Sequence, residues 1–269
     1  MNWLIDFIKM VWNAIFGGGG PSGTFFKCSM FFPADLSNPW PNNQGVDSSL
    51  DWATDEGRPW VDARRKFAYK QTRANGADTI LFIAEKLYNN PALQKKLTSK
   101  DGEVAVARKA GIQRWIVDLF NDGHGIPVAK REDYIKQVCP LYSWASDKQV
   151  AFMVCLESDE KLAAAEVMQI VEWIYKYAPG KRVIIGSANP NFLKAFTGTG
   201  AELWLETACH PFKLNMQNAD VYIDSVNVLK SYGPAIAGEY GRGSGDAAQY
   251  VTERAIKIGC SMVGSYVEG

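Results

Sequence analysis

Short apolar segments alternate with helical patterns along the chain from residue 24 onward. Segments rich in β-branched and aromatic residues predict eight strands, over residues 25–32, 79–84, 114–120, 150–156, 182–186, 202–205, 235–238 and 260–267. Apolar residues at helical spacing predict seven helices between them, over residues 61–74, 103–110, 131–144, 161–177, 191–196, 220–231 and 247–257. Such alternation is typical of a parallel α/β architecture.

The number of elements favours a closed barrel over an open sheet. Eight strands and seven helices make a (β/α)8 TIM barrel that lacks its last helix, and such a barrel needs roughly 250 residues. The alternative is an open, doubly wound sheet, which usually carries a glycine-rich phosphate loop after its first strand. Here the first strand leads into Phe31, Phe32 and Pro33 without such a loop. We therefore predict an α/β fold with a barrel domain over residues 24–269.

The beginning of the chain does not fit the barrel pattern. Residues 1–16 are strongly apolar, and residues 17–23 form a glycine-rich linker. Apolar positions in the first segment recur at helical spacing: Leu4, Phe7, Ile8, Val11 and Ile15. A helix of this length rises about 24 Å, which is short of the roughly 30 Å hydrocarbon core of a bilayer. A secretory signal is not expected either, because Asp6 interrupts the segment and Lys9 is its only basic residue.

We interpret residues 1–16 as an amphipathic docking helix on a glycine tether. Its apolar face needs a cover, which the chain's own barrel, a second copy or a partner protein would supply. Docking to a partner protein or a homo-oligomer is the interpretation that we favour. Binding in the interface of a membrane, without a membrane span, is the remaining alternative.

The charge balance argues against a nucleic-acid partner. The chain has 29 Lys and Arg residues against 29 Asp and Glu residues, whereas nucleic-acid binding relies on clustered positive charge. Its five cysteines form no CxxC pair, and Cys28, Cys155 and Cys260 lie in apolar segments, which predicts buried free thiols. The chain has only two histidines, neither with metal-ligand spacing, so we expect no metal and no cofactor.

Polar residues follow most of the predicted strands. In a barrel, catalytic side chains gather at the carboxyl ends of the strands. The residues at these ends are Asp35, Glu85, Asp118, Glu157, Asn189, Glu206, His210, Glu239, Tyr240 and Tyr266. Glu157 and Glu239 stand out because each directly follows an apolar strand, and the fourth and seventh strands lie across the barrel from each other. Two such carboxyl groups can flank a glycosidic bond, one as acid and the other as nucleophile or base.

The placement of these two glutamates resembles that in the clan A glycoside hydrolases, which are retaining (β/α)8 enzymes. The segment from Pro234 to Gly241 (PAIAGEYG) is similar to the nucleophile strand of the cellulase- and mannanase-like members. The resemblance implies that Glu239 is the nucleophile and Glu157 the acid/base, and that His210 belongs to the site.

The sequence departs from the clan pattern in two places. Leu156 stands where the clan usually has an asparagine that binds the sugar 2-hydroxyl, and Asn189 is a candidate substitute. Tyr266 lies near the position of the usual tryptophan after the last strand.

Aromatic residues in the first long loop suit a carbohydrate ligand. Trp40, Trp52 and Trp60 lie in or beside this polar loop, where their rings can stack on sugars or simply pin the loop to the barrel. The residues that we expect to bind substrate are Asp35, Trp40, Asp118, Asn189, Glu206, His210, Tyr240 and Tyr266.

These patterns predict a retaining glycoside hydrolase that cleaves a polysaccharide or oligosaccharide. The docking helix would attach it to a larger assembly such as a phage tail, so an extracellular or virion-associated location is favoured over a cytoplasmic one. Two alternatives stay open. One is a non-catalytic carbohydrate-binding or structural barrel, which Leu156 favours. The other is a different barrel enzyme that uses Asp118, Glu157 or Glu206 on a small molecule.

Overall fold

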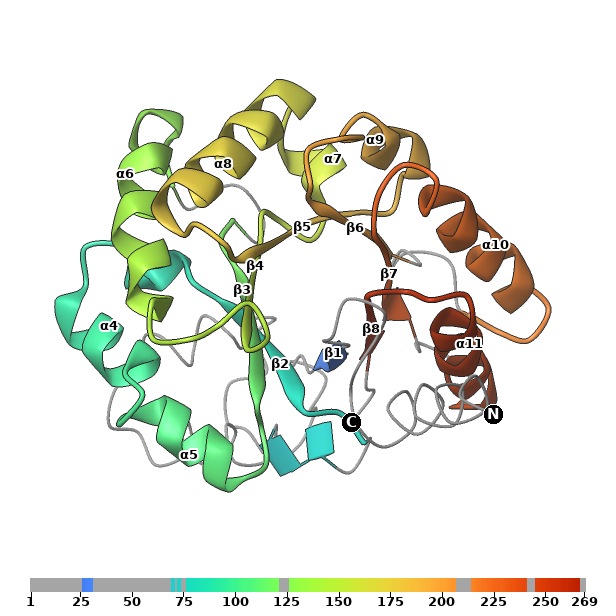
Figure 1. Ribbon diagram of the computed structural model, residues 1–269, viewed down its shortest axis with the longest axis horizontal. Coiled ribbons are helices and arrows are strands. Elements are labelled where there is room, and N and C mark those ends of the chain that lie inside the picture. Colours follow the sequence, from blue (N-terminus) through green and yellow to red (C-terminus); the bar gives the residue numbers. More distant parts are fainter. Residues whose placement is uncertain are drawn as a thin grey trace, which may run out of the picture.

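A computed structural model shows a closed barrel of parallel strands ringed by helices (Figure 1). It describes residues 26–30, 69–70, 72–73, 76–120, 126–206, 214–240 and 245–266. The strands are β1 (Phe26–Met30), β2 (Thr79–Ile83), β3 (Arg114–Asp118), β4 (Val150–Met153), β5 (Arg182–Ser187), β6 (Glu202–Glu206), β7 (Ala235–Tyr240) and β8 (Met262–Tyr266). Neighbours in sequence pair in parallel, and β1 pairs with β8 to close the barrel. The predicted barrel is thus confirmed.

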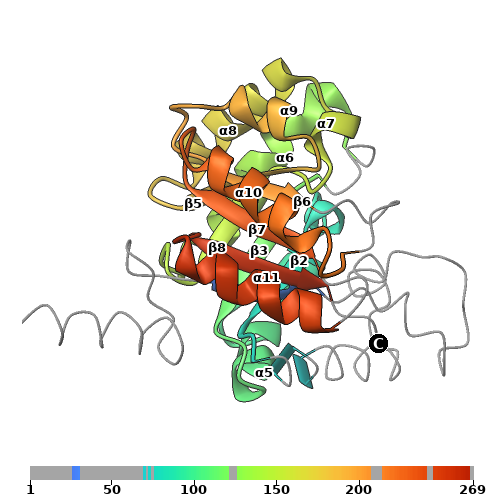
Figure 2. The same cartoon turned by 90° about the vertical axis from the view of Figure 1, so that its right-hand side faces the viewer.

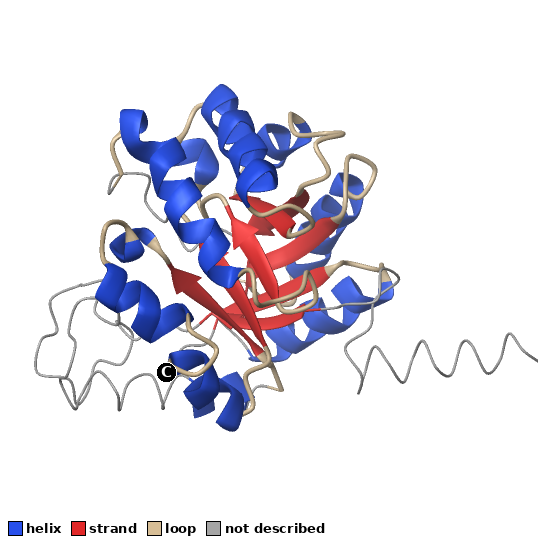
Figure 3. Cartoon of the chain, turned by 60° about the vertical axis from the view of Figure 1, so that its left-hand side comes forward, coloured by secondary structure: helices blue, strands red, loops and turns tan. Residues whose placement is uncertain are grey.

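Helices surround the strands on the outside (Figure 3). They are η3 (Glu85–Leu87), α4 (Pro91–Thr98), α5 (Glu103–Lys109), η4 (Val128–Lys130), α6 (Arg131–Val138), η5 (Cys139–Tyr142), α7 (Ser158–Lys161), α8 (Ala164–Tyr177), α9 (Pro190–Lys194), α10 (Ala219–Leu229) and α11 (Gly245–Lys257). Helix α4 was not predicted from the sequence, although its start is well marked. Asn90 caps the helix by accepting the Leu93 N–H at 3.1 Å, and Pro91 occupies the first turn.

The interior of the barrel is filled by one apolar cluster. Its members are Ile116, Ala151, Met153, Leu156, Ile184, Trp204, Ile236 and Met262. Trp204 on β6 is the largest of them and is fully buried. A Cβ atom on Gly238 of β7 or on Gly264 of β8 would overlap its indole ring. The two glycines therefore make room for one tryptophan, which fills the centre of the barrel at the density of a protein core.

A second apolar layer lies between the strands and the helices. Val117, Leu203 and Val263 point outward into this layer and are fully buried. Helices α10 and α11 cover the outside of β7 and β8, as the side view shows (Figure 2). Their apolar faces include Val226 and Val251, both fully buried. Each strand of this part of the barrel is thus packed on both faces, as expected for a parallel sheet.

A polar network links the amino-terminal ends of several strands. Arg182 of β5 forms a bidentate ion pair with Glu202 of β6. The Ser261 hydroxyl donates to the same carboxylate at 2.5 Å. This pairing satisfies charges that are largely buried and links the starts of β5, β6 and β8.

Cysteines behave as the sequence predicts where the structure describes them. Cys155 and Cys260 are buried thiols that form no disulfide, as is Cys139. Burial raises the pKa of the Cys260 thiol to about 12. The side chain of Cys28 lies outside the described part of the chain.

The predicted docking helix (residues 1–16) and glycine linker (residues 17–23) lie outside the described residues. The first long loop (residues 33–59) and Trp40, Trp52 and Trp60 also lie outside them. Within the part that the structure describes, no helix is long and apolar enough to cross a membrane.

We predict that Gly264→Ala lowers the free energy of unfolding by about 1–3 kcal/mol, because the new methyl group overlaps the Trp204 ring. Urea denaturation measures the effect. Gly233→Ala is the matched control, since its Cβ would meet no atom closer than 3.5 Å. Adding Trp204→Leu should make the double variant less destabilised than the sum of the single changes. Equal stability of the two alanine variants would contradict this packing.

Candidate functional site

The carboxyl ends of β4 to β7 form a continuous edge that carries the candidate carboxylates. The Gly186 N–H of β5 donates to the Cys155 carbonyl at 3.1 Å, which joins β5 to the chain after β4. Gly186 pairs with Trp204 of β6, and Glu206 pairs with Gly238 of β7. The strand ends that carry Glu157, Glu206 and Glu239 therefore lie along one side of the rim. Glu206 lies between the other two.

Glu206 is buried inside this rim, with 4% of its surface exposed. Its Oε1 lies 2.9 Å from the point where a Cβ on Gly186 would stand, and that Cβ would overlap the Leu156 carbonyl. The carboxylate of β6 thus reaches across β5 toward the end of β4. Only glycine at position 186 allows this close approach of acid and backbone.

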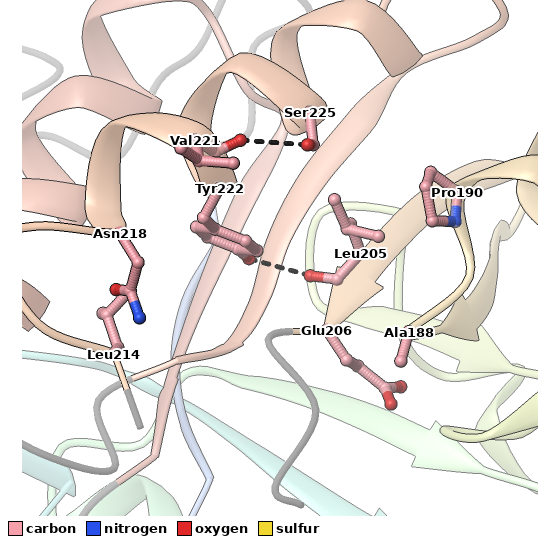
Figure 4. A pocket seen from close by; sticks show the side chains of 9 residues that line it. All are labelled: Ala188, Pro190, Leu205, Glu206, Leu214, Asn218, Val221, Tyr222 and Ser225. Carbon is pink, nitrogen blue, oxygen red and sulfur yellow. Dashed lines mark hydrogen bonds between the residues drawn. The ribbon is translucent and has the colours of Figure 1, made fainter. Parts of the chain in front are cut away.

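Tyr222 of α10 fastens the two strand ends that carry Glu206 and Glu239. Its hydroxyl lies 2.8 Å from the Leu205 carbonyl and 3.1 Å from the Gly238 carbonyl, and it donates to these two oxygens. Figure 4 shows the hydroxyl pointing at Leu205 from the helix. Leu205 and Gly238 directly precede the two glutamates, so one buried hydroxyl fixes where both side chains begin.

The fourth strand is shorter than predicted, because β4 ends at Met153 and not at residue 156. Backbone pairing with β5 nevertheless continues, since the Val154 N–H donates to the Ile184 carbonyl at 2.8 Å. Glu157 is partly buried and occupies the N-cap position of α7. Its side chain accepts no capping hydrogen bond from the backbone N–H groups of that helix. Its neighbour Leu156 belongs to the apolar interior of the barrel. The chain therefore turns at the rim, and Glu157 stays on the carboxyl side of the barrel.

Asp118 ends β3 and is completely buried. Its Oδ1 accepts the Phe120 N–H at 3.3 Å. Behind it, the Tyr134 hydroxyl donates to the Leu119 carbonyl at 2.7 Å. Burial, together with the negative charges of Glu85 and Asp118, raises the pKa of Tyr134 well above its usual value. This side of the rim is therefore a buried acidic region, and Tyr134 stays protonated beside it.

Asn189 is exposed just after β5, where it caps the next helix. Its Oδ1 accepts the N–H groups of Asn191 and Phe192, so it caps α9. The hydroxyl of Ser187, the last residue of β5, donates to Asp159 at 2.5 Å. These bonds join the start of α7 to the start of α9 on the rim.

Other predicted site residues are placed only by their backbone or not at all. Glu239 and Tyr240 end β7 and Tyr266 ends β8, but their side chains lie outside the described part of the structure. The pairing of β7 with β8 shifts between Ala237 and Tyr240, and such irregularities often re-aim side chains next to active sites. Asp35, Trp40 and His210 also lie outside the described residues.

The described residues include no group of three or more metal-ligating side chains that could hold a metal ion. The residues that reasoning from sequence missed are Gly186 and Tyr222, which position acids rather than act themselves. A buried tyrosine on the apolar face of a predicted helix was the available signal for Tyr222, because a buried hydroxyl must find a partner.

No protein-family model and no curated protein sequence matches the chain. Solved structures match its fold at low identity. The GH5_18 protein of Streptomyces cattleya, solved in complex with GlcNAc, is 14% identical with a TM-score of 0.58, covering 90% of this chain and 70% of that chain. A broad-specificity GH5-4 endoglucanase from an uncultured bacterium is 13% identical with a TM-score of 0.56, covering 93% and 87%.

The homocysteine methyltransferase of Escherichia coli is also similar in fold. It is 13% identical with a TM-score of 0.53, and the match covers 91% of each chain. The protein thus has a (β/α)8 barrel fold like that of GH5 glycoside hydrolases. The same fold also supports other chemistry, so the function must be argued from the site.

We predict that Tyr222→Phe lowers the free energy of unfolding by about 1–3 kcal/mol, because it leaves two buried carbonyl groups without their donor. Tyr250→Phe is the matched control, since that hydroxyl bonds Asp220 at the surface, and its loss should cost under about 0.5 kcal/mol. Thermal or urea unfolding compares the two variants. Equally small losses of unfolding free energy in the two variants would show that the Tyr222 hydroxyl does not hold the two strand ends together.

Proposed function

We propose that this protein is a retaining glycoside hydrolase in which Glu239 is the nucleophile and Glu157 the acid/base. The observation that carries the proposal is the rim itself. Glu157 follows β4 and Glu239 lies near the end of β7, both on the carboxyl side of a closed barrel, with β5 and β6 between them. The likeness of the segment around Glu239 to the nucleophile strand of clan A enzymes, and the GH5 folds among the similar structures, support the same assignment.

The proposed reaction has two displacements at the anomeric carbon. First, the Glu239 carboxylate attacks that carbon while Glu157 gives its proton to the glycosidic oxygen, whose bond to the carbon breaks. The second half reverses the roles. Glu157 takes a proton from water, the water oxygen attacks the anomeric carbon, and the bond to Glu239 breaks. Two inversions leave the anomeric configuration as it began.

The other candidates would bind the saccharide around these two acids. Buried carboxylates such as Asp118 and Glu206 accept hydrogen bonds from sugar hydroxyl groups. Aromatic rings stack on sugar faces, which is the role proposed for Trp40, Tyr240 and Tyr266. We assign Asp35, Asn189 and His210 to polar contacts with the same substrate, a polysaccharide or oligosaccharide.

One observation favours a second candidate function, a barrel that binds carbohydrate without cleaving it. Leu156 packs in the apolar interior beside Met153. The residue before the proposed acid/base therefore offers no amide to the substrate. A carbohydrate-binding protein would keep the polar rim but would not cleave the glycosidic bond. An assay of hydrolysis therefore distinguishes the two functions.

We expect Glu239→Gln and Glu157→Gln each to lower kcat by about 10²–10⁴-fold on a glycan that the protein hydrolyses, because each removes a reacting carboxyl group and keeps its shape. A panel of glycans, assayed by released reducing ends, identifies the substrate. Glu160→Gln on α7 is the control, as this acid is exposed.

Proton NMR of the first product gives the stereochemistry of the reaction. Retention of the anomeric configuration supports the nucleophile, whereas inversion rejects it. Unchanged activity of Glu239→Gln would reject the assignment of that residue. Saccharide binding without hydrolysis of any glycan in the panel would establish the second candidate instead.

We also propose that residues 1–16 dock the barrel to a partner or to a second copy of the chain through residues 17–23. The apolar stripe of the segment is the support for this proposal. Such an arrangement suits an enzyme displayed on a larger assembly, in an extracellular or virion-associated setting.

Replacing Phe7 and Val11 with glutamate should shift the protein to a smaller assembly, because charges on the apolar stripe oppose its burial. Light scattering after size-exclusion chromatography measures the mass. Asn2→Glu and Asn13→Glu, on polar positions of the same segment, are the control. An unchanged mass and unchanged partner capture on deletion of residues 1–20 would refute docking.

A further inference from the structure

Exposed apolar side chains and acids share one face of α10. Val221 and Val228 are 68% and 52% exposed, and they lie seven residues apart, which places them on the same face of the helix. Asp224 lies between them and Asp220 lies one turn earlier, both exposed. Asp220 accepts the Tyr250 hydroxyl at 2.6 Å, but within the described ranges neither aspartate forms an ion pair. We call the two valines and two aspartates the α10 stripe.

A groove of about 450 Å³ lies between α4 and η5. Pro91, Leu141 and Trp144 give it apolar walls, and Lys95 and Lys100 also line it. Both lysines are exposed, and neither is ion-paired in the part of the chain that the structure describes. The other lining residues are Gln94, Thr98, Ser99 and a single acid, Asp101. The groove thus combines apolar walls with an excess of positive charge.

Trp144 is a fixed wall of this groove. Its Nε1 donates to the Thr98 carbonyl at 2.8 Å, and the Arg108 guanidinium lies over its ring, 5.0 Å from the centroid. Trp115 packs against it edge to face, with 5.8 Å between the ring centroids. The Trp144 side chain nevertheless stays partly exposed. An aromatic side chain that is already held in place loses little conformational entropy on contact, which suits it to anchor a protein interface.

The α10 stripe and the groove lie on opposite sides of the barrel (Figure 1). Helix α10 connects β6 to β7, whereas α4 connects β2 to β3, which is four strands away around an eight-stranded barrel. One copy of the chain therefore cannot place its own α10 in its own groove. The two surfaces are nonetheless complementary, because a helix with exposed valines and two acids meets a groove with apolar walls and two lysines.

We propose that the α10 stripe of one copy of this chain docks into the groove of a second copy. Val221 and Val228 pack against Trp144, and the two aspartates face the two lysines. Because the two surfaces differ, the contact is heterologous and repeats from copy to copy, so it builds a ring or a filament. This contact requires neither the proposed hydrolase activity nor the proposed docking through residues 1–16.

Sedimentation velocity of the full chain measures this association as the concentration rises to about 1 mM, which detects a contact with a Kd in the millimolar range. Every protein compared carries Phe7→Glu and Val11→Glu, so that docking through residues 1–16 does not enter. We expect the mean mass to rise with concentration. The rise should be smaller in about 0.5 M NaCl than in about 0.05 M NaCl, because salt screens the charges.

Reversing a charge on either surface tests the pairing. Asp224→Lys and Lys95→Glu should each weaken the association about tenfold or more, because each brings like charges together across the contact. Mixing the two variants, or combining both substitutions in one chain, should restore it, since the exchanged charges again attract. Glu172→Lys is the control, because it makes the same change of charge at an exposed position on α8. Circular dichroism confirms that each variant is folded.

A monomer at every concentration would overturn the proposal. Association that both reversals leave unchanged would also overturn it, as would a loss that the exchanged pair does not restore. If the wild-type chain associates and the chain with Phe7→Glu and Val11→Glu does not, the contact belongs to residues 1–16 and the docking of α10 is rejected.

Discussion

Closure of the barrel around a filled interior is the constraint on which the rest of the structure depends. Trp204 occupies the centre, and Gly238 and Gly264 approach it because they have no side chain. Its indole nitrogen has no hydrogen-bond partner among the described residues, and the burial of the ring offsets that cost. Because all eight strands are parallel, closure brings every carboxyl end to one rim, and no open sheet edge remains.

The interior changes from apolar to acidic within two residues on two of the strands. Ile116 is followed by Asp118 on β3, and Trp204 by Glu206 on β6, with each pair on the same face of its strand. The acids therefore stand directly above an apolar, buried layer. Charges act more strongly there than in water, which is the environment that catalysis and selective binding need.

The sequence was sufficient to predict the barrel because each strand is a short apolar segment and each connection has a helical period. It was also sufficient to predict that Asp118, Glu157 and Glu206 lie at the carboxyl side of the barrel, since the strand ends in this fold meet at one rim. It could not predict Gly186 as the contact of Glu206, or the clamp formed by Tyr222. The Gly186 contact depends on which strands become neighbours, and the Tyr222 hydrogen bonds depend on how far α10 lies from those strands. The spacing of residues along the chain determines neither.

Leu156 and Glu206 are best understood together. Met153 and Leu156, three residues apart, both enter the barrel interior, whereas Cys155 belongs to the outer layer, so the strand alternation slips just before the rim. That slip places an apolar side chain where an amide is expected from the resemblance to clan A enzymes. An acid from another strand, Glu206, approaches this point instead, since its Oε1 and the Leu156 carbonyl both crowd the Cβ position of Gly186. The polar side chain at this point of the rim therefore comes from β6, whereas the end of β4 contributes a hydrocarbon side chain.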